Sequence, residues 1–257
     1  MSTNTTSVWR KKLKELEIVV VIPTYNNGKT LAAVIEEVCR YADDIIVVND
    51  GSTDDTANIL EQYPAIRTIT HPVNKGKGTA LKHGLSQAKK EGFRYAITID
   101  SDGQHFASDI PCFIEAIEKE PDTLLVGARN LASDNMPGKN TFANKFSNFW
   151  FRLETGLKLE DTQSGYRLYP LRKMDVQSCW YTAKYEFELE AIVFAAWGDV
   201  AVKNISIHVY YPPQAERVSH FRPFRDFTRI SVLNTVLVLI TCLWIVPRNL
   251  LRKLSWS

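Results

Sequence analysis

The stretch Tyr95–His105, Tyr-Ala-Ile-Thr-Ile-Asp-Ser-Asp-Gly-Gln-His, joins an apolar segment to a group of oxygen-bearing side chains. The apolar segment is typical of a strand buried inside a sheet. If the extended conformation continues beyond it, residues two apart point to the same side, which predicts that Asp100, Asp102 and Gln104 converge. Hard oxygen donors of this kind suit Mn²⁺ or Mg²⁺ and leave positions for water and substrate phosphates. The alternative is a polar turn that closes the strand, because Asp-X-Asp is common by chance.

Short apolar runs alternate with amphipathic helical patterns through the first half of the chain. This alternation predicts an α/β fold with a mostly parallel sheet and helices on both faces. In such sheets, ligands bind beyond the carboxyl ends of the strands. Polar segments that follow three different strands (23–28, 49–52 and 100–104) should therefore share one edge, which is the best sequence evidence for a site. The predicted strands are 19–22, 45–48, 66–70, 96–99, 124–126 and one within 200–211.

Two further polar segments and one aromatic stripe follow. Residues 131–140 contain Gly and Pro and are predicted to form a loop beside the site, and residues 161–167 form a second polar loop. Between them, aromatic residues recur at helical spacing; a core role is favoured, with contact to lipid as the alternative. The stripe consists of Phe142, Phe146, Phe149, Trp150 and Leu153.

Composition excludes several classes of protein. The 257 residues carry a formal net charge of +2, so no bulk basic field indicates a nucleic-acid partner. The four cysteines are far apart in sequence and form no C-x-x-C pair, which argues against a disulfide framework or a zinc site. Residues 1–17 lack the apolar core of a signal peptide and are predicted to be a surface lead-in, so we expect the folded part to lie in the cytosol.

The glycine-rich segment Gly76-Lys-Gly78 resembles a phosphate loop only in part. The third glycine of a dinucleotide fingerprint would fall on Leu81, and a P-loop pattern is absent from the sequence. A turn before a helix and a contact to a nucleotide through Lys77 both stay open. Asp50 likewise has two interpretations, a turn residue or an acceptor for a base N–H or a ribose hydroxyl.

Five motifs in this order resemble family 2 glycosyltransferases of the GT-A fold. Four of them are Val20-Val-Ile-Pro-Thr-Tyr-Asn, Val47-Val-Asn-Asp-Gly-Ser-Thr-Asp-Asp-Thr, Gly76-Lys-Gly-Thr-Ala and Asp100-Ser-Asp-Gly-Gln-His. The fifth, Asp161-Thr-Gln-Ser-Gly-Tyr-Arg, is similar to a signature of the dolichyl-phosphate mannose synthase-like, or polyprenyl-phosphate glycosyltransferase, branch. The resemblance implies a Rossmann-like GT-A domain over residues 18–211.

The resemblance also implies an inverting transfer of sugar from a nucleoside diphosphate, of the GDP-mannose or UDP-glucose type. Asp100, Asp102 and Gln104 would hold Mn²⁺ or Mg²⁺ on the donor. Lys145 departs from the branch, where arginine is usual; lysine keeps the charge but loses the bidentate fork for a phosphate. The implied donor-nucleotide contacts are Pro23, Tyr25, Asn26, Asp50, Lys77 and Asp100. The implied acceptor or phosphate contacts are Arg129, Lys145, Ser164, Arg167, His220 and Arg222.

The nature of the acceptor decides whether a general base is needed. A hydroxyl acceptor needs one, and Asp161, Glu188 and Glu190 are the candidates, each of which can equally be a loop cap or a solvated helix residue. A phosphate acceptor is already anionic near neutral pH, because its second pKa is about 6. The sequence leaves both acceptors open.

The C-terminal part is predicted to meet a membrane. Residues 212–229 interleave phenylalanines with arginines, as an interfacial segment does, and residues 230–257 comprise an apolar helix and a basic tail. The apolar run 230–246 is at the short end of the roughly 17–25 residues that span a bilayer, so a span and an in-plane anchor both stay open.

These observations predict a membrane-attached glycosyltransferase with its catalytic domain in the cytoplasm. We expect transfer of one sugar to a lipid acceptor, most simply polyprenyl (dolichyl or undecaprenyl) phosphate. The alternatives are transfer to a hydroxyl-bearing glycolipid or other lipid, and a catalytically silent membrane protein that binds sugar nucleotides.

Overall fold

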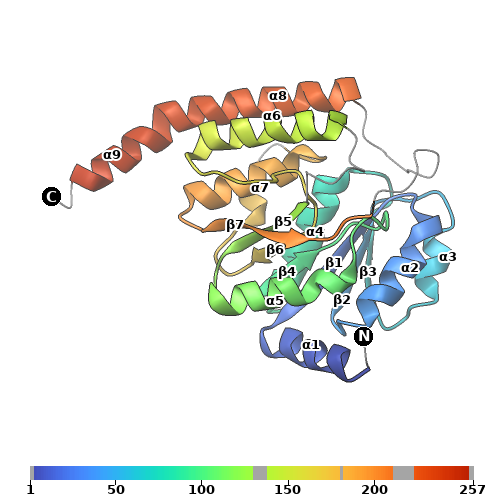
Figure 1. The fold of residues 1–257 in the computed structure, drawn as a ribbon. Helices are drawn as coiled ribbons and strands as arrows, with labels where there is room; N and C mark the ends of the chain where they lie inside the picture. Colours follow the sequence, from blue (N-terminus) through green and yellow to red (C-terminus); the bar gives the residue numbers. More distant parts are fainter. Residues whose placement is uncertain (1–2, 130–137, 180–181, 211–222, 255–257) are drawn as a thin grey trace.

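A computed structural model describes residues 3–129, 138–179, 182–210 and 223–254. Strands and helices alternate along the first half of the chain, as the sequence predicts (Figure 1). The strands are β1 (Ile18–Thr24), β2 (Ile45–Asn49), β3 (Arg67–Thr70), β4 (Tyr95–Thr98), β5 (Leu124–Arg129), β6 (Arg167–Pro170) and β7 (Val202–Ile207). The helices are α1 (Thr3–Glu15), α2 (Gly28–Cys39), α3 (Thr56–Glu61), α4 (Lys77–Lys90), α5 (Ile110–Lys119), α6 (Gly138–Thr155), α7 (Glu186–Trp197), α8 (Pro223–Ile240) and α9 (Val246–Leu254). Short 3₁₀ turns are η1 (Ala107–Asp109) and η2 (Val176–Ser178), and a π-helical turn, η4 (Thr241–Ile245), joins α8 to α9.

The described strands form one sheet in the order β3-β2-β1-β4-β6-β5-β7. Every pairing is parallel except those of β6, which runs antiparallel to both β4 and β5. The predicted mostly parallel sheet is therefore confirmed. The strand β6 itself was not predicted, because four residues ending at a proline carry too little alternation to be recognised.

Helices cover both faces of the sheet, and alternate residues of each strand pack on opposite sides. In β1, Val19 and Val21 pack in a core with α4 and α7, whereas Val20 and Ile22 pack in a second core with α2 and α5. Such alternation with both sides apolar is the pattern of a strand buried on two faces. The two cores hold the sheet rigid, so that its polar edge is fixed in position.

The N-terminal segment, predicted to be a surface lead-in, is helical and lies at the surface with one side against the domain. It forms the helix α1, whose Leu13 is buried in the core beside β1 and α5. Trp9 is partly buried against the same core, and Lys12 pairs with Glu118 of α5 at 2.7 Å, so several contacts dock the helix on the domain.

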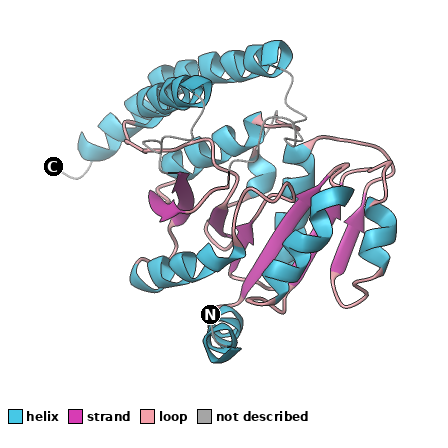
Figure 2. Cartoon of the chain, turned by 45° about the vertical axis from the view of Figure 1, so that its right-hand side comes forward, coloured by secondary structure: helices cyan, strands magenta, loops and turns pink. Residues whose placement is uncertain are grey.

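The C-terminal helices form a layer with α6 on the far side of the molecule from α1, as both views show (Figures 1 and 2). The helical segment Arg225–Arg252 is long and apolar enough to cross a membrane, and it is the one such helix among the described residues. The predicted loop at 131–140 and the interfacial segment 212–229 lie largely outside the described residues.

Candidate active site

The carboxyl ends of β1, β2, β3 and β4 lie at one edge of the sheet because these strands are parallel. The antiparallel strand β6 begins where β4 ends, since Arg167 pairs with Thr98. It therefore brings the preceding loop, 161–166, to the same edge, where the hydroxyl of Thr98 donates to the carbonyl oxygen of Gly165 at 2.8 Å. The three polar segments predicted to share an edge do so, and residues 161–166 join them.

The turn that carries Asp100 and Asp102 does not continue the strand. β4 ends at Thr98, and Gly103 adopts a φ of 74°, a left-handed conformation that glycine accepts readily. The carboxylate of Asp102 accepts from the backbone N–H of Gln104 at 3.0 Å, which closes the turn. The expectation that these side chains align through strand alternation is thus wrong, because a turn, not an extended segment, positions them.

The start of α2 holds this turn in place. The amide of Asn27 donates to the hydroxyl of Ser101 at 2.8 Å, and the hydroxyl of Thr30 donates to the carbonyl oxygen of Ser101 at 2.6 Å. A turn that is fastened on its buried side presents its remaining side chains in a defined direction.

Lys77 lies between two carboxylates. Its ammonium group is 2.8 Å from Asp100 and 3.1 Å from Glu188. Burial on its own lowers the pKa of Lys77, but the charges of Asp100 and Glu188 raise that pKa above its ordinary value. Burial raises the pKa of Asp100, but the charge and hydrogen bond of Lys77, together with the charges of His105 and Arg167, hold that pKa below its ordinary value. The predicted donor-binding residue Lys77 and the predicted metal ligand Asp100 therefore form an ion pair here.

Asp102 and His105 lie beside this pair, in surroundings that disfavour the charged form of each side chain. Burial, followed by the nearby charge of Asp100, raises the pKa of Asp102 to about 6. Burial lowers the pKa of His105 to about 4, so its ring is neutral at neutral pH. The buried Nδ1 atom of His105 has no hydrogen-bond partner among the described residues.

Gly165 packs directly against the Lys77 cluster. A Cβ atom there would lie 2.6 Å from Asp100 Oδ2, 2.8 Å from Lys77 Nζ and 3.0 Å from Glu188 Oε1. A side chain at this position would push the charged groups apart. The loop 161–166 is thus part of the site through its backbone as well as through its side chains.

Asp50 is buried and serves the neighbouring turn. Its carboxylate accepts from the backbone N–H groups of Lys75 at 2.9 Å and Gly76 at 2.7 Å, and it bonds the ring of His71 at 2.6 Å. Asp50 therefore positions the Gly76-Lys-Gly78 turn that carries Lys77. Its contact with a nucleoside stays a prediction.

The other predicted nucleotide contacts lie at the end of β1. Pro23 is buried within the strand, paired in register with Val48, and Tyr25 is half-buried at the edge. Asn26 adopts a φ of 52° and accepts from the backbone N–H of Thr53 at 2.8 Å. Their contacts to a nucleotide are untested.

Arg129 and Asp161 form a second charged pair at this edge. The guanidinium donates to both carboxylate oxygens, Nε at 2.5 Å and Nη2 at 2.9 Å. Asp161 is fully buried, and its Oδ1 also accepts from the backbone N–H of Gln163. Burial alone raises the pKa of Asp161, but the hydrogen bonds and charge of Arg129 lower it below the ordinary value. A carboxylate so occupied is a poor general base, so the structure does not support that role for Asp161.

The expectation that Ser164 and Arg167 line the acceptor side is also not supported. Arg167 is fully buried, and its guanidinium donates to the carbonyl oxygens of Ser164, Thr162 and Glu188. Ser164 is buried, and its hydroxyl accepts from the backbone N–H of Tyr166 at 3.3 Å. Arg167 fastens the loop to α7 through the carbonyl oxygen of Glu188, whereas the bond of Ser164 lies within the loop.

The remaining candidates lie elsewhere. Glu190 is buried and accepts from the hydroxyl of Thr182, which leaves it unsuited to take a proton from an acceptor. Lys145 is exposed on α6 and takes no part in the described network around Asp100. His220 and Arg222 fall outside the described residues.

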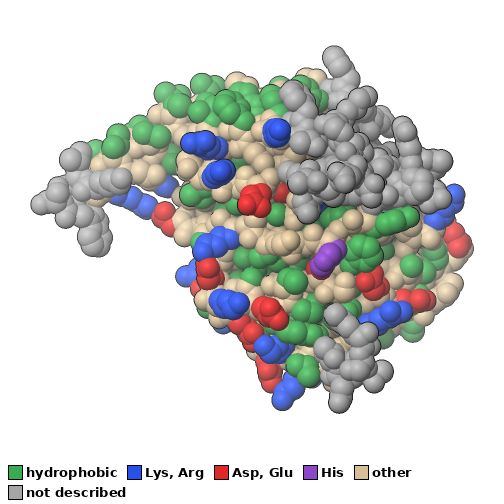
Figure 3. Space-filling view, viewed as in Figure 1, with side chains coloured by type: hydrophobic (Ala, Val, Ile, Leu, Met, Phe, Trp, Pro, Cys, Tyr) green, Lys and Arg blue, Asp and Glu red, His purple; other side chains and the backbone are tan. Residues whose placement is uncertain are grey.

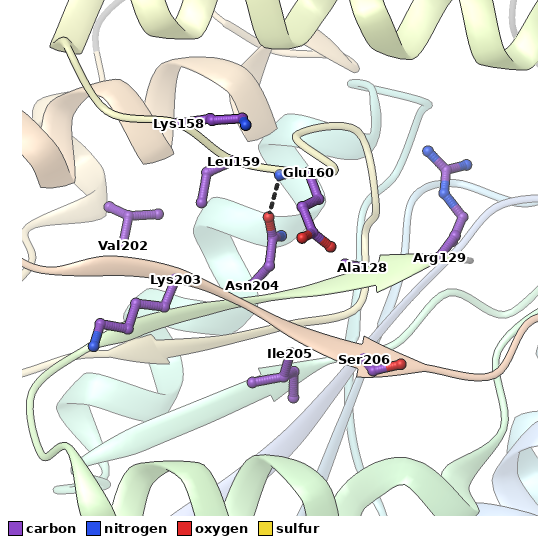
Figure 4. A pocket seen from close by; sticks show the side chains of 10 residues that line it. All are labelled: Ala128, Arg129, Lys158, Leu159, Glu160, Val202, Lys203, Asn204, Ile205 and Ser206. Atoms are coloured by element: carbon purple, nitrogen blue, oxygen red, sulfur yellow. Dashed lines mark hydrogen bonds between the residues drawn. The ribbon is translucent and has the colours of Figure 1, made fainter. Parts of the chain in front are cut away.

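A separate groove of about 810 Å³ opens on the other side of this region, between β7 and the segment before Asp161. Figure 4 shows the side chain of Asn204 meeting the backbone of Glu160 at its centre, with Lys158 and Lys203 near one end and Arg129 at the other. Of the predicted site residues, it includes only Arg129. The groove contains none of the predicted metal ligands, so we place the site at the Asp100 turn instead.

The residues at this turn fit a divalent cation. Two close carboxylates, one with a raised pKa, repel each other, and the buried imidazole nitrogen beside them has no partner in the described part of the chain. A bound cation would reduce the repulsion between the two carboxylates, and carboxylate and amide oxygens are suitable ligands for it. Within the described part of the chain, no group of three His, Cys, Asp or Glu side chains is arranged around one point. The fit therefore rests on Asp100, Asp102 and the amide of Gln104.

Sequence reasoning missed several residues of the site. Glu188 was considered as a base, but its pairing with Lys77 joins residues 111 apart in sequence and leaves no local signal. The positions of Gly165 and His71 likewise depend on β6 and β3 in three dimensions. His105 stands within the motif Asp100-Ser-Asp-Gly-Gln-His, and its closeness to Asp100 in sequence was the available hint.

Comparison with known proteins shows the family to which the chain belongs. The profile of glycosyl transferase family 2 matches residues 19–175. A UDP-N-acetylglucosamine–dolichyl-phosphate N-acetylglucosaminyltransferase of Methanococcus voltae is 29% identical over 240 residues, which cover 84% of this chain and 96% of that protein. A polyprenol monophosphomannose synthase of Mycolicibacterium smegmatis is 27% identical over 62% of this chain and 64% of its own length.

Among solved structures, glucosyl-3-phosphoglycerate synthase of Mycobacterium tuberculosis, in complex with Mn²⁺, UDP and phosphoglyceric acid, has a similar fold. It superposes with a TM-score of 0.65 over 92% of this chain and 82% of that one, at 21% identity. At this identity the likeness concerns the fold alone. The match to the family covers more than half of the chain, and the sheet edge carries its motifs in order. The chain therefore belongs to glycosyl transferase family 2 and is a glycosyltransferase of the polyprenyl-phosphate branch.

Proposed function

We propose that this glycosyltransferase moves one sugar from a nucleoside-diphosphate sugar to the phosphate of a polyprenyl phosphate, with inversion at the sugar carbon. The observation that carries the proposal is the state of the three candidate general bases. Asp161 is held by Arg129, Glu188 by Lys77, and Glu190 is buried against Thr182. A hydroxyl acceptor would need one of them, whereas a phosphate needs none near neutral pH, because its second pKa is about 6.

The names of the relatives support the same acceptor. The proteins of M. voltae and M. smegmatis are named for dolichyl phosphate and polyprenol monophosphate. The donor is proposed to be a UDP- or GDP-sugar; the M. voltae relative is named for UDP-N-acetylglucosamine, and the M. tuberculosis synthase has been solved with UDP-glucose.

In the proposed mechanism, Asp100, Asp102 and Gln104 hold Mn²⁺ or Mg²⁺. When bound, such a cation neutralises the charge that builds on the departing diphosphate. Lys77 supplies a further positive charge at the same point, and its partly buried position strengthens the interaction of that charge with an anion. An acceptor phosphate oxygen attacks the sugar carbon as the bond to the diphosphate breaks, so the nucleoside diphosphate leaves with the bonding electron pair.

We also propose that the catalytic domain faces the cytoplasm beside a membrane. The apolar run 230–246 is flanked by Arg229 and Arg248, and basic residues next to apolar segments favour the cytoplasmic side.

The proposal can be tested by giving the enzyme labelled donors together with two acceptors that differ only in the phosphate group. The purified full chain with Mn²⁺ is given UDP-glucose, UDP-N-acetylglucosamine or GDP-mannose, together with polyprenyl phosphate or the corresponding polyprenol. We expect one of the three donors to transfer label to polyprenyl phosphate, and none of them to transfer label to the polyprenol. The variant Asp102→Asn should lose the transfer. Label on the alcohol alone would overturn the acceptor, and equal transfer with and without a chelator would overturn the metal dependence.

A further inference from the structure

The segments α8, η4 and α9 form a long helical rod with two apolar faces. Its inner face packs on the domain and includes Leu233, Leu237 and Ile245, which are 8%, 2% and 8% exposed. The contacts of α8 are with α6 and α7. A helix that is already docked through one apolar face has no need of a second one for folding.

The outer face carries a continuous apolar stripe. In α8 its residues are spaced by four and three, which keeps them on one side of the helix, and the apolar residues in and beyond the π-helical turn are exposed as well. They are 40% to 74% exposed, and Trp244 beside them is 68% exposed. The stripe consists of Val232, Val236, Leu239, Leu243, Val246 and Leu250.

The helix α6 widens this surface. Its Phe149 and Leu153 are 60% and 49% exposed, and the rings of Phe146 and Phe227 join the two helices at 5.5 Å between centroids. Figure 3 shows hydrophobic side chains gathered along the edge of the molecule formed by α8 and α6. The core role favoured for the aromatic stripe of α6 is thus not confirmed: Phe149 and Leu153 of the stripe face outward, and Phe151, which is not part of the stripe, is the residue buried in the core. Exposed apolar area of this extent indicates an interaction site.

The rod is fastened to the domain along its length. Arg229 pairs with Glu186 at 2.7 Å near one end, and Arg252 pairs with Asp199 at 3.2 Å near the other. Between them, the hydroxyl of Thr241 donates to the carbonyl oxygen of Glu154 at 2.8 Å. If this rod crossed a bilayer, the domain would have to enter the hydrocarbon with its polar groups, or all these contacts would have to break. The docked arrangement is compatible only with a helix that lies in the plane of the membrane.

Charge distinguishes a lipid surface from a second copy of the chain. The alternating spacing of the stripe is also that of a coiled coil, but coiled coils carry charged residues beside the seam. No charged residue occurs from Ile230 to Pro247, whereas basic residues stand at both ends. On α6, Arg152 is exposed as well. An uncharged apolar centre with a basic rim matches an anionic bilayer.

We propose that the outer faces of α8, α9 and α6 form a membrane-binding surface, which seats the enzyme on one leaflet of an anionic bilayer with the long helix parallel to the membrane. This surface would bring the catalytic domain beside a lipid acceptor without a transmembrane segment. Binding itself involves no sugar transfer, so the proposal stands or falls separately from the proposed function.

Flotation of the full chain with vesicles tests the surface. Vesicles are made of phosphatidylcholine with or without phosphatidylglycerol, and the variant is Leu239→Glu combined with Leu243→Glu. Since carboxylates are costly in hydrocarbon, we expect the double variant to bind at least about tenfold more weakly. The control Val8→Glu, at a 52% exposed position on α1, should bind as the unaltered protein does. Both variants are checked by thermal unfolding, which should be unchanged because the replaced side chains are exposed.

Nitroxide labels test the orientation. Val232→Cys, Leu239→Cys and Val246→Cys are labelled one at a time after the exposed Cys112 and Cys242 are replaced by serine. The outer two positions are about 21 Å apart along a helix. An in-plane rod places all three labels at one depth, whereas a span places the middle label deepest with the outer two near opposite surfaces. The proposal would be overturned if the labels showed the depth gradient of a spanning helix, or if the double variant bound vesicles as tightly as the unaltered protein. It would also be overturned if the protein did not bind vesicles but self-associated, and the double variant lost that self-association.

Discussion

Two acidic centres lie at the same edge of the sheet, and their negative charge is balanced in different ways. Asp161 is neutralised from within the chain by the paired nitrogens of Arg129. Asp100 and Glu188 share the ammonium group of Lys77, and Asp102 lies near Asp100 with its pKa raised to about 6, first by burial and then by the charge of Asp100. The first centre is complete, whereas the second has an excess of negative charge. Only the second is therefore suited to receive a cation from outside.

The largest expected effect comes from removing one carboxylate of the second centre. Asp102→Asn should lower sugar transfer by about a thousandfold, because a cation contributes several kcal/mol of charge stabilisation in the transition state. Binding of Mn²⁺, measured by titration calorimetry, should weaken in parallel. The exposed Glu61→Gln serves as a control and should change neither quantity.

The same Asp102→Asn variant should be more stable than the unaltered protein when no metal is present. Because the pKa of the folded Asp102 lies above its ordinary value of 3.8, the folded state holds a proton that the unfolded state has released between about pH 4 and 6. The free energy of unfolding of the unaltered protein therefore falls as the pH rises through this window. Asp102→Asn cannot ionise and avoids this loss, so its free energy of unfolding at pH 7 should be higher by an amount on the order of 2 kcal/mol. Lower stability in urea unfolding would contradict the excess of negative charge.

The first centre should respond in the opposite direction. Asp161→Asn leaves the Arg129 guanidinium without its charge partner, and breaking a buried pair in this way should lower the free energy of unfolding by about 3 kcal/mol. Urea unfolding measures the change. If Asp161→Asn abolished transfer but left stability unaltered, Asp161 would act in the chemistry and the comparison between the centres would fail.

A steric change tests whether the two centres are joined through the loop 161–166. Gly165→Ala would place a methyl group 2.6 Å from Asp100 and 2.8 Å from Lys77. We expect a loss of about 2 kcal/mol in stability, as for other overpacked sites, together with weaker Mn²⁺ binding. Gly156→Ala is a useful contrast, because a Cβ atom there meets no neighbour within 4 Å although its φ of 76° is strained. It should affect stability without affecting metal binding.

The sequence predicted the second centre better than the first for a physical reason. Asp100, Asp102 and Gln104 are neighbours in sequence, and the parallel alternation placed their turn at the ligand-binding edge. Asp161 reaches Arg129 only because β6 runs antiparallel between β4 and β5, which four residues could not reveal. Even at the second centre, the detail was wrong: the strand ends at Thr98, and a turn fixed by Thr30 and Asn27 replaces the expected alternation.

A third buried acid, Glu154, sharpens the comparison because it has neither an arginine nor a cation site. It lies on α6 beneath α8, is 2% exposed, and its Oε1 has no partner among the described residues. Burial raises its pKa to about 8, so a proton balances its charge at neutral pH. The negative charge of a buried acid is thus balanced in three ways in this protein: by an arginine at Asp161, by the proposed external cation at Asp102 and by a bound proton at Glu154.

Glu154→Gln tests that third solution and should give the smallest effect. Between about pH 4.5 and 8 the folded state holds a proton that the unfolded state has lost, so the stability of the unaltered protein should fall as the pH rises through this range. The glutamine variant cannot ionise and should show a flatter profile. Its gain at pH 7 should be only about 1 kcal/mol, because a buried amide also carries a desolvation cost. Melting temperatures across this range, with the exposed Glu160→Gln as the control, measure the slope. An unchanged slope would mean that Glu154 is ionised in the folded protein, and a partner for its charge would then have to lie in the segments around α6 and α8.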